Sequence, residues 1–406
     1  MRKFWFTLTL TACGALSAAD WPQFRGPNMD SHTSEAGLLF EWPADGLKKL
    51  WSTPVGDGGG GIHAGPVIVG GKVYTPGKVG TKDVIYCINA ADGKELWHFD
   101  YEAPGQANWG MGMRATPTVA NGKVYTLSRY GQVYCIDAEK GTEVWHKDQM
   151  KDYAGNQPGF GLAAAPLVFD NMVVIEPGGK GASLVALEAA TGKEIWKAGD
   201  DASAYATPTL ATIQGVKQIV SFPASGLVAR DPKDGKELWR FDYVDKQKKN
   251  CAMPLVVDDQ VFVPNNTLGW VAVGIKKDGD KWSVTKLWAK PTEHVHFSPA
   301  VLGDGCAFFH NGGGSIKCID LKDGSVKWEL PKMGQQQAML LRMDDKHLLA
   351  LLDTGEVVLM EATKDAGKQI ARFQAVGGTS FSQPAIADGK LFVRDYKTIA
   401  CFEIKK

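Results

Sequence analysis

One position in this sequence recurs in place but varies in chemistry. It lies three residues before a proline that opens a short apolar segment. Prolines hold this place at 66, 117, 166, 208, 254, 299 and 384, and Leu340 holds it in an eighth segment. The residues three positions earlier are His63, Arg114, Ala163, Tyr205, Cys251, His296, Gln337 and Phe381. The next position is small in all but one segment, being Ala64, Ala115, Ala164, Ala206, Ala252, Phe297, Ala338 and Ser382. A uniformly small position beside a varied one indicates that the first packs and the second faces a cavity.

Several of these varied residues carry side chains that could bind a small ligand. Cationic, hydroxyl, amide and aromatic groups that converge on one concave apolar site are typical of small-molecule binding. The alternative is a water-filled channel whose polar walls are solvated. The binding hypothesis predicts a ligand site formed by His63, Arg114, Tyr205, His296, Gln337 and Phe381.

Metal-dependent chemistry has less support in the sequence. His63 and His296 fall in the first and sixth repeats, well apart, and two histidines without a third convergent ligand do not form a zinc site. Asp92, Asp234 and Asp323 stand one per repeat without a neighbouring acidic cluster, so we interpret them as turn residues rather than calcium ligands. We assign no catalytic residue and no metal ligand.

A recurring unit must hold these segments in place. Asp-Gly-Lys-Glu-Leu-Trp occurs at 92–97 and at 234–239, and looser copies lead to tryptophans at 145, 196 and 328. With Trp51 and Trp288, the tryptophans follow one another at intervals of 40 to 51 residues. Asp-Gly favours a tight turn, because glycine reaches positive φ at little steric cost. A period of this length indicates a repeat architecture. We expect each tryptophan to pack between neighbouring sheets.

Each repeat predicts four short strands joined by tight turns, which is a four-stranded antiparallel sheet. The chain has eight first strands, but the last repeat, 381–404, stops after its third strand. The segment around Trp51 is a tryptophan strand with no repeat before it. We therefore predict an all-β, eight-bladed β-propeller whose last blade is closed by the N-terminal strand. Ala371 replaces tryptophan in the seventh blade, which we expect to be the loosest.

The cysteines fit the same repeat. Four of them share one repeat position, at 87, 135, 318 and 401, where other repeats have Ala186 and Ala229. A position that alternates between cysteine and alanine is a small buried slot. The cysteines are therefore predicted to be free structural thiols rather than disulfide partners.

Three regions divide the chain. Residues 1–19 have a basic start, an apolar stretch and small residues before Asp20, as in a secretory signal peptide too short to span a bilayer. Residues 20–47 form an N-terminal extension that we expect to lie across the body, and 48–406 form the propeller. Leu10-Thr11-Ala12-Cys13 resembles a lipoprotein box, so lipid anchoring through Cys13 is the alternative to cleavage near Ala19. Either route exports the protein, in a bacterium to the periplasm.

The charge of the chain narrows the class of partner. Lysine plus arginine and aspartate plus glutamate number 45 each, and no basic stripe is present. Nucleic acid and anionic membrane surfaces attract basic patches, so both are poor partners for this protein.

The Asp-Gly-Lys turn before tryptophan, with its Ala-x-Pro first strands, resembles the repeat of the PQQ-like (quinoprotein-like) β-propeller family over about residues 48–404. The opening Trp21-Pro-Gln-Phe-Arg-Gly-Pro27 is similar to the start of exported members. The family includes quinoprotein alcohol dehydrogenases and BamB, a periplasmic lipoprotein of the outer-membrane assembly machinery. The resemblance implies the fold but leaves the function open, because one fold hosts unrelated activities.

The dehydrogenase motifs are missing from this chain. Those enzymes carry adjacent cysteines over the cofactor and carboxylates around a calcium ion, whereas this chain has no Cys-Cys pair and no carboxylate at the varied position. The resemblance therefore implies a BamB-like, non-catalytic scaffold. We expect it to be a monomer that needs no cofactor and binds a periplasmic or outer-membrane protein. The alternative is a PQQ-dependent dehydrogenase with calcium, or a small-ligand sensor, that uses the central funnel; Trp109 or Trp270 could then supply a stacking floor.

Overall fold

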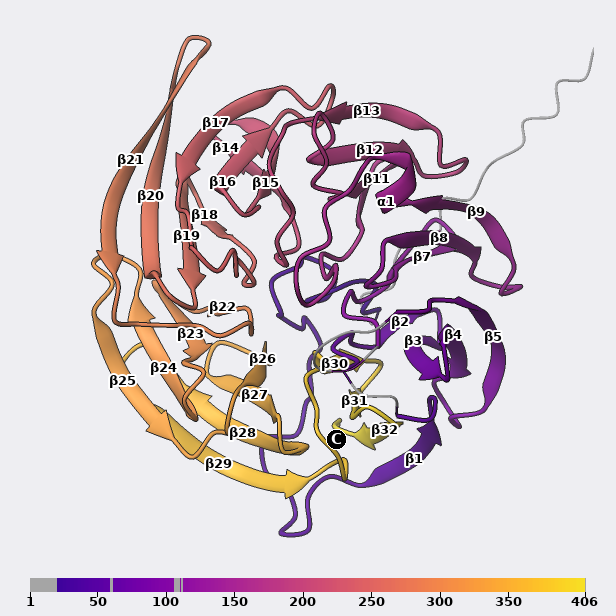
Figure 1. Cartoon of the computed structure of the whole chain (residues 1–406). Coiled ribbons are helices and arrows are strands. Elements are labelled where there is room, and N and C mark those ends of the chain that lie inside the picture. Colours follow the sequence, from indigo (N-terminus) through magenta and orange to yellow (C-terminus); the bar gives the residue numbers. More distant parts are fainter. Residues whose placement is uncertain (1–19, 59–60, 106–109, 111, 406) are drawn as a thin grey trace, which may run out of the picture.

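The computed structural model describes residues 20–58, 61–105, 110 and 112–405. Within them, 32 strands form eight four-stranded sheets around a centre (Figure 1), and α1 (Gln149–Asp152) is a single short helix. All eight sheets are antiparallel, and in all but one the four strands follow one another as a meander, as the turn spacing predicted. The eight-bladed β-propeller is confirmed.

The blades follow one another in chain order. Blade 1 contains β2 (Val67–Val69), β3 (Lys72–Val79), β4 (Lys82–Asn89) and β5 (Glu95–Glu102). Blade 2 contains β6 (Thr118–Ala120), β7 (Lys123–Leu127), β8 (Gln132–Asp137) and β9 (Glu143–Asp148). Blade 3 contains β10 (Leu167–Phe169), β11 (Met172–Ile175), β12 (Leu184–Glu188) and β13 (Glu194–Ala198). Blade 4 contains β14 (Thr209–Ile213), β15 (Val216–Ser221), β16 (Gly226–Arg230) and β17 (Glu237–Asp242).

The second half of the ring repeats this plan. Blade 5 contains β18 (Leu255–Val257), β19 (Gln260–Asn265), β20 (Gly269–Asp278) and β21 (Lys281–Lys290). Blade 6 contains β22 (Val301–Leu302), β23 (Cys306–His310), β24 (Ser315–Asp320) and β25 (Val326–Pro331). Blade 7 contains β26 (Ala338–Arg342), β27 (His347–Leu352), β28 (Glu356–Ala362) and β29 (Gly367–Gln374). Blade 8 contains β30 (Ala385–Ala387), β31 (Lys390–Arg394), β32 (Thr398–Glu403) and β1 (Lys49–Pro54).

Blade 8 closes the ring with the two ends of the chain. Strand β1 pairs antiparallel with β32, placing Trp51 opposite Cys401. The tryptophan strand without a repeat of its own therefore completes the last sheet, as predicted. A sheet assembled from both ends of the chain fastens the ring, and closure leaves no open blade at either end.

The tryptophans pack between neighbouring blades, as expected. The indole N–H of Trp97 in blade 1 donates to the carbonyl of Ala138 in blade 2 at 3.2 Å, and Trp145 in blade 2 donates to Ala189 in blade 3 at 3.0 Å. The turn glycine of the next blade lies against the indole. A methyl group on Gly192 would come within 2.7 Å of Trp145. Glycine is needed here both for its positive φ and for this close approach.

A β-bulge accompanies each of these turns. In blade 1 the register shifts so that Cys87 faces Trp97 but Ile88 faces Glu95, which leaves Leu96 as the extra residue. Leu96 is 48% exposed. The aliphatic residue before the tryptophan therefore lies at the outer rim, outside the core.

The aspartates and cysteines have the structural roles predicted for them. The Asp92 and Asp234 carboxylates accept the backbone N–H groups of Lys94 and Lys236, at 3.2 and 2.9 Å, which is the local bonding of a turn. All six cysteines in the described chain are free, and five are buried.

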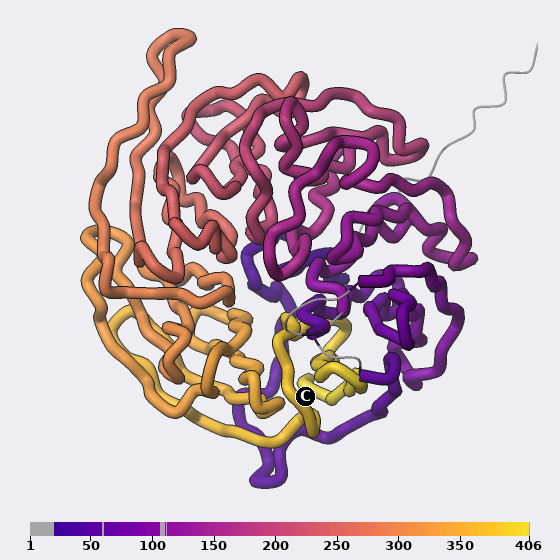
Figure 2. The backbone as a smooth tube through the Cα atoms, in the orientation of Figure 1, coloured from indigo at the N-terminus to yellow at the C-terminus, as the bar shows by residue number. Residues whose placement is uncertain are grey.

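The N-terminal extension crosses one end of the ring. Trp21 forms a bridge with Ile68 of blade 1, and the N–H of Val119 in blade 2 donates to the Pro22 carbonyl at 2.8 Å. The Arg25 guanidinium then reaches the Ala300 carbonyl at the start of blade 6, at 2.7 Å. Figure 2 shows this segment, in indigo, passing behind the middle of the ring. The extension therefore spans the propeller from blades 1 and 2 to the far side.

The extension continues along blades 7 and 8. The Thr33 N–H donates to the Arg342 carbonyl of blade 7 at 3.1 Å, and the Leu39 N–H donates to the Ile404 carbonyl of blade 8 at 2.8 Å. Residues 1–19, which the sequence predicts to be a signal peptide, lie outside the described residues together with Cys13, and so does Trp109. In the described chain, no helix is both long enough and apolar enough to cross a membrane.

Candidate functional site

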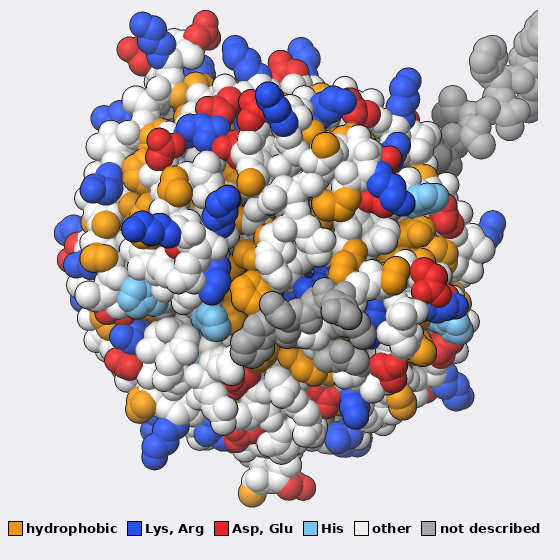
Figure 3. All heavy atoms as spheres, viewed as in Figure 1, with side chains coloured by type: hydrophobic (Ala, Val, Ile, Leu, Met, Phe, Trp, Pro, Cys, Tyr) orange, Lys and Arg blue, Asp and Glu red, His pale blue; other side chains and the backbone are white. Residues whose placement is uncertain are grey.

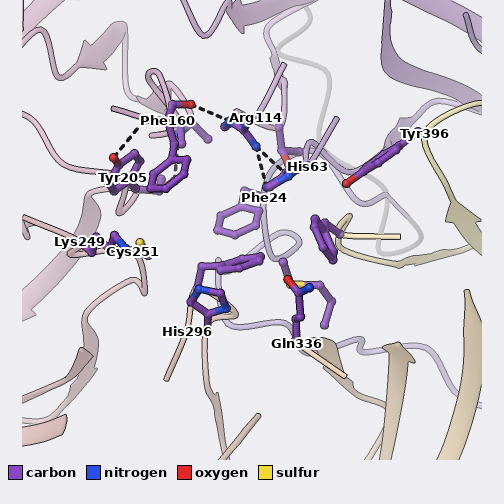
Figure 4. Close-up of a pocket in the computed structure, with 17 residues that line it drawn as sticks. Phe24, His63, Arg114, Phe160, Tyr205, Lys249, Cys251, His296, Gln336 and Tyr396 are labelled. Atoms are coloured by element: carbon purple, nitrogen blue, oxygen red, sulfur yellow. Dashed lines mark hydrogen bonds between the residues drawn. The ribbon is translucent and has the colours of Figure 1, made fainter. Parts of the chain in front are cut away.

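A cavity of about 280 Å³ lies at the centre of the ring, where the loops that enter the inner strands converge. We call this cavity the funnel. Its volume is near the lower end of the range for small-molecule sites. Figure 4 shows its lining residues: Phe24, His63, Arg114, Thr116, Phe160, Ala163, Ala165, Tyr205, Thr207, Lys249, Cys251, His296, Phe297, Gln336, Met339, Phe381 and Tyr396. On this face, charged side chains of both signs lie around the rim, and hydrophobic side chains show near the centre (Figure 3).

Five of the six predicted ligand-binding residues line the funnel: His63, Arg114, Tyr205, His296 and Phe381. Gln337 does not. It is 1% exposed, and its side-chain oxygen accepts from the Ser298 hydroxyl at 3.4 Å, while its neighbour Gln336 lines the cavity instead. Blade 7 has Leu340 where the other blades have proline, so β26 begins at Ala338, earlier in its repeat than the other inner strands. Without the proline, the ladder extends and the neighbouring residue takes the cavity position.

Other lining residues were not predicted, because they come from outside the repeated position. Phe24 belongs to the extension, Phe160 and Lys249 to connections between blades, and Tyr396 to the turn between β31 and β32. Phe297 occupies the position predicted to pack, yet it lines the funnel. Phe297 is the one large residue at a repeat position that is otherwise small. That exception could have predicted that it faces the cavity.

The funnel's arginine is positioned by neutral acceptors. The Arg114 Nε–H donates to the Phe160 carbonyl at 2.7 Å, and its Nη1 lies 2.7 Å from Nε2 of His63. His63 is therefore an acceptor, and burial, with the nearby positive charge of Arg114, holds its pKa well below the usual value. Burial lowers the pKa of Arg114 to about 10, which still leaves it protonated at neutral pH.

Two further cations contact Phe160, whose carbonyl Arg114 also bonds. Arg129 is 1% exposed and donates to the carbonyls of Gly110 and Phe160, the latter at 3.0 Å. The ammonium of Lys249 lies 5.5 Å from the centre of the Phe160 ring. In the described chain neither Arg129 nor Lys249 forms an ion pair with a carboxylate. The nearby Asp83 carboxylate acts on Arg129 but forms its ion pair with Lys78 at 3.1 Å, so the funnel keeps a net positive charge.

Aromatic rings form the rest of the wall. Phe297 lies 4.4 Å from the ring of His296 and 5.8 Å from that of His63, and Phe381 lies 4.9 Å from His63. The two histidines, predicted to lie well apart, thus approach one another across a single phenylalanine ring, because the inner strands converge at the axis. On the other side, the Phe160 N–H donates to the Tyr205 hydroxyl at 3.3 Å.

The lining combines cationic and aromatic side chains with weakly basic imidazoles. None of the described lining residues is an aspartate or a glutamate. Burial lowers the pKa of His296 as well as that of His63, so both imidazoles are weak bases. Among the described residues, no group of three histidine, cysteine or acidic side chains could hold a metal. Cations and rings of this kind suit a ligand with negative charge and a planar apolar body.

Comparison with known proteins identifies the family to which the repeats belong. The sequence profile of the family described as "Outer membrane protein assembly factor BamB" matches residues 43–108 and 81–330. Quinohemoprotein alcohol dehydrogenase ADH-IIG of Pseudomonas putida is 32% identical over 145 residues, which are 34% of this chain and 19% of that enzyme. The chain thus matches about a fifth of the length of this curated relative.

Solved structures show the same fold. BamB from Moraxella catarrhalis superposes with a TM-score of 0.62 and 14% identity, covering 88% of this chain and 98% of that chain. Quinohemoprotein alcohol dehydrogenase ADHIIG from Pseudomonas putida HK5 superposes with a TM-score of 0.63 and 14% identity, covering 96% of this chain and 80% of that chain. At this identity the likeness establishes the propeller and nothing about activity.

The residues of the funnel do not fit a calcium–PQQ centre. Calcium takes six to eight oxygen ligands, with carboxylates prominent among them. The described lining offers hydroxyls at Thr116, Thr207, Tyr205 and Tyr396 and one amide at Gln336, but no carboxylate. Arg114 and Lys249 would repel a divalent cation. The donor set therefore favours an anion over a metal ion.

Proposed function

The chain belongs to the family of outer membrane protein assembly factor BamB, and we propose that it is an exported, non-catalytic binding scaffold that holds its partner at the funnel face. The partner would be a periplasmic or outer-membrane protein. The signal-peptide pattern of residues 1–19 supports export. The balanced charge of the chain favours a protein partner over nucleic acid.

The lining of the funnel is the observation that carries this proposal. It combines cations and aromatic rings, which serve recognition, and its described residues supply no carboxylate for proton transfer. The extension crosses the opposite end of the ring, where the Arg25 guanidinium reaches blade 6. Because the extension occupies that end, we infer that the partner approaches the open funnel face.

A quinoprotein-like dehydrogenase is the second candidate, and the 32% identity to ADH-IIG over 145 residues favours it. The lack of carboxylates in the described lining argues against it, because calcium would have no strong ligand there. The two candidates differ in a measurable activity.

The first experiment tests for catalysis. The exported protein is incubated with PQQ and calcium and assayed for dye-linked oxidation of primary alcohols. We expect no turnover above that of PQQ and calcium alone. Alcohol oxidation at any rate that depends on the protein would overturn the scaffold proposal and support the dehydrogenase.

The second experiment tests for a partner in the cell envelope. A photo-crosslinking amino acid replaces Lys249 or Gln336 at the funnel face, and in a control it replaces the exposed Asn28 of the extension. We expect one envelope protein to be captured from the funnel positions and not from position 28. Equal capture from all three positions would contradict a funnel-face scaffold.

A further inference from the structure

The charge of the funnel limits what it can bind. Arg114 and Lys249 line the cavity, and Arg129, at 1% exposure, shares the Phe160 carbonyl with Arg114. Arg129 donates to the carbonyls of Gly110 and Phe160, and its buried Nε has no hydrogen-bond partner. Buried positive charge that is bonded to carbonyl dipoles is only partly compensated, so an anion in the cavity is stabilised.

The shape of the funnel limits the body of the ligand. Phe297 and Phe381 stand edge to face at 5.5 Å on one side, and Phe160 lies near Tyr205 on the other, with ring centres 6.0 Å apart. Phe24 enters between these two walls from the extension (Figure 4). Phe24 is only partly buried and lines the cavity, so part of its ring is available to a planar guest.

From the charge and the rings together we propose that the funnel binds a compact aromatic carboxylate without a metal ion. Arg114 and Lys249 hold the carboxylate, and Phe24 packs against the ring. The inference rests on the proposed function, because it names the chemistry that the binding face recognises. It also gives the N-terminal extension a second role, as part of the ligand site.

Other ligand classes fit the funnel less well. A divalent metal ion would meet two cations and no carboxylate in the described lining. The cavity of about 280 Å³ suits one or two fused rings better than a larger molecule.

Isothermal titration calorimetry on the exported protein, in buffer with a chelator, tests the proposal with defined probes. We expect 1-naphthoate to bind one to one. The neutral analogue 1-naphthalenemethanol and the non-aromatic cyclohexanecarboxylate should each bind at least about tenfold more weakly, since each lacks one of the two recognised features. Titrations with PQQ, in the presence and absence of calcium, show whether binding at this site requires a metal ion.

Variants locate the binding. Lys249→Gln should weaken naphthoate binding about tenfold, whereas Lys246→Gln, an exposed neighbour in the same loop, should leave it unchanged. Phe24→Ala should weaken naphthoate binding about tenfold and leave the weak binding of cyclohexanecarboxylate unchanged. Arg114→Gln should abolish binding. Arg114 also donates a hydrogen bond to the Phe160 carbonyl, so its replacement could unfold the protein. The melting temperature of the Arg114→Gln variant is therefore measured. If this variant does not fold, the Lys249 and Phe24 variants provide the test.

Three results would overturn the proposal: equal affinity for naphthoate and naphthalenemethanol, binding only when calcium is present, or no heat with any probe. Each leaves the scaffold proposal standing if cross-linking from position 249 still captures an envelope partner. Protein-dependent alcohol oxidation, in contrast, would remove the scaffold proposal itself.

Discussion

The outer rim and the inner ring of this propeller use the same repeat in opposite ways. At the rim, six blades send an indole N–H to the next blade, as Trp97 does to Ala138 and Trp328 does to Thr363. In the inner ring, the residue at the equivalent position varies in chemistry, from His63 to Arg114 to Tyr205. Equivalent positions that repeat a contact maintain the fold. Positions that share a place but differ in side chain are the ones left to recognise a ligand.

The rim has two exceptions, and both lie where the neighbouring blade is unusual. Trp239 donates to Gln218 of its own blade at 2.6 Å, beside a blade 5 whose outer strands β20 and β21 are ten residues each and protrude in Figure 1. At the junction of blades 7 and 8, Ala371 stands at the tryptophan position. There Trp42 of the extension packs edge-on against Phe373 at 5.6 Å.

Removing one rim contact should have the largest effect on stability. Trp145→Ala deletes a buried indole and its 3.0 Å hydrogen bond to Ala189, so we expect the free energy of unfolding to fall by about 3–5 kcal/mol. Urea unfolding followed by circular dichroism measures it. Val144→Ala is the matched control: that bulge residue is 40% exposed, and its replacement should change stability by less than about 0.5 kcal/mol. Equal effects would mean that the tryptophan does not join the blades.

A buried carboxyl beside the inner ring should make stability depend on pH. Glu176 accepts the N–H of Ala204, next to Tyr205, and burial raises its pKa to about 8. From about pH 5 to 8 the unfolded chain loses this proton while the folded chain keeps it, so stability falls as pH rises. The slope reaches about 1.4 kcal/mol per pH unit.

Glu176→Gln should remove this slope. The buried histidines His63 and His310, whose pKa values are lowered, produce the opposite slope, but they are present in both proteins and cancel in the difference. The measurement is thermal or urea unfolding of both proteins from pH 5 to 8. A difference between them that does not change with pH would show that Glu176 is ionised in the folded protein.

Paired glycine replacements separate backbone strain from the rim contact. Gly122 and Gly192 both have φ near +70°, but a methyl group would meet nothing within 4 Å at Gly122 and would lie 2.7 Å from Trp145 at Gly192. We expect Gly122→Ala to cost about 1 kcal/mol through its φ alone. Gly192→Ala should cost roughly 1–2 kcal/mol more, because the indole must also move. Equal losses of stability in the two variants would show that the Trp145 indole can move aside without a measurable loss of free energy.

The exception at blade 7 should give the smallest effect. Trp42→Ala removes an edge contact with Phe373 and a 3.0 Å hydrogen bond to the Leu39 carbonyl, and we expect a loss of about 1 kcal/mol. Amide hydrogen exchange should rise in β29 and stay unchanged in β9 of blade 2. Faster exchange in β29 than in β9 of the unaltered protein would support the prediction that blade 7 is the loosest. A uniform response around the ring would contradict it.

The funnel was predicted only in part, for an identifiable reason. The repeated register located His63, Arg114, Tyr205, His296 and Phe381 because each precedes a proline that fixes where its inner strand begins. Where Leu340 replaces the proline, β26 starts at Ala338 and the register misassigned Gln337. Phe24 and Lys249 follow no register, so the pattern held no information about them.

By itself the sequence determined the ring: a tryptophan and a turn glycine at a constant period encode sheets that can bury their faces only against one another, and the unpaired strand at Trp51 encodes the closure. Only the tertiary structure decided which side chains share the funnel. The contact of Arg25 with Ala300, and the cavity shared by Phe24 and Phe381, bring together residues hundreds of positions apart. No local pattern records such distances, because they are set by the closure of the whole ring.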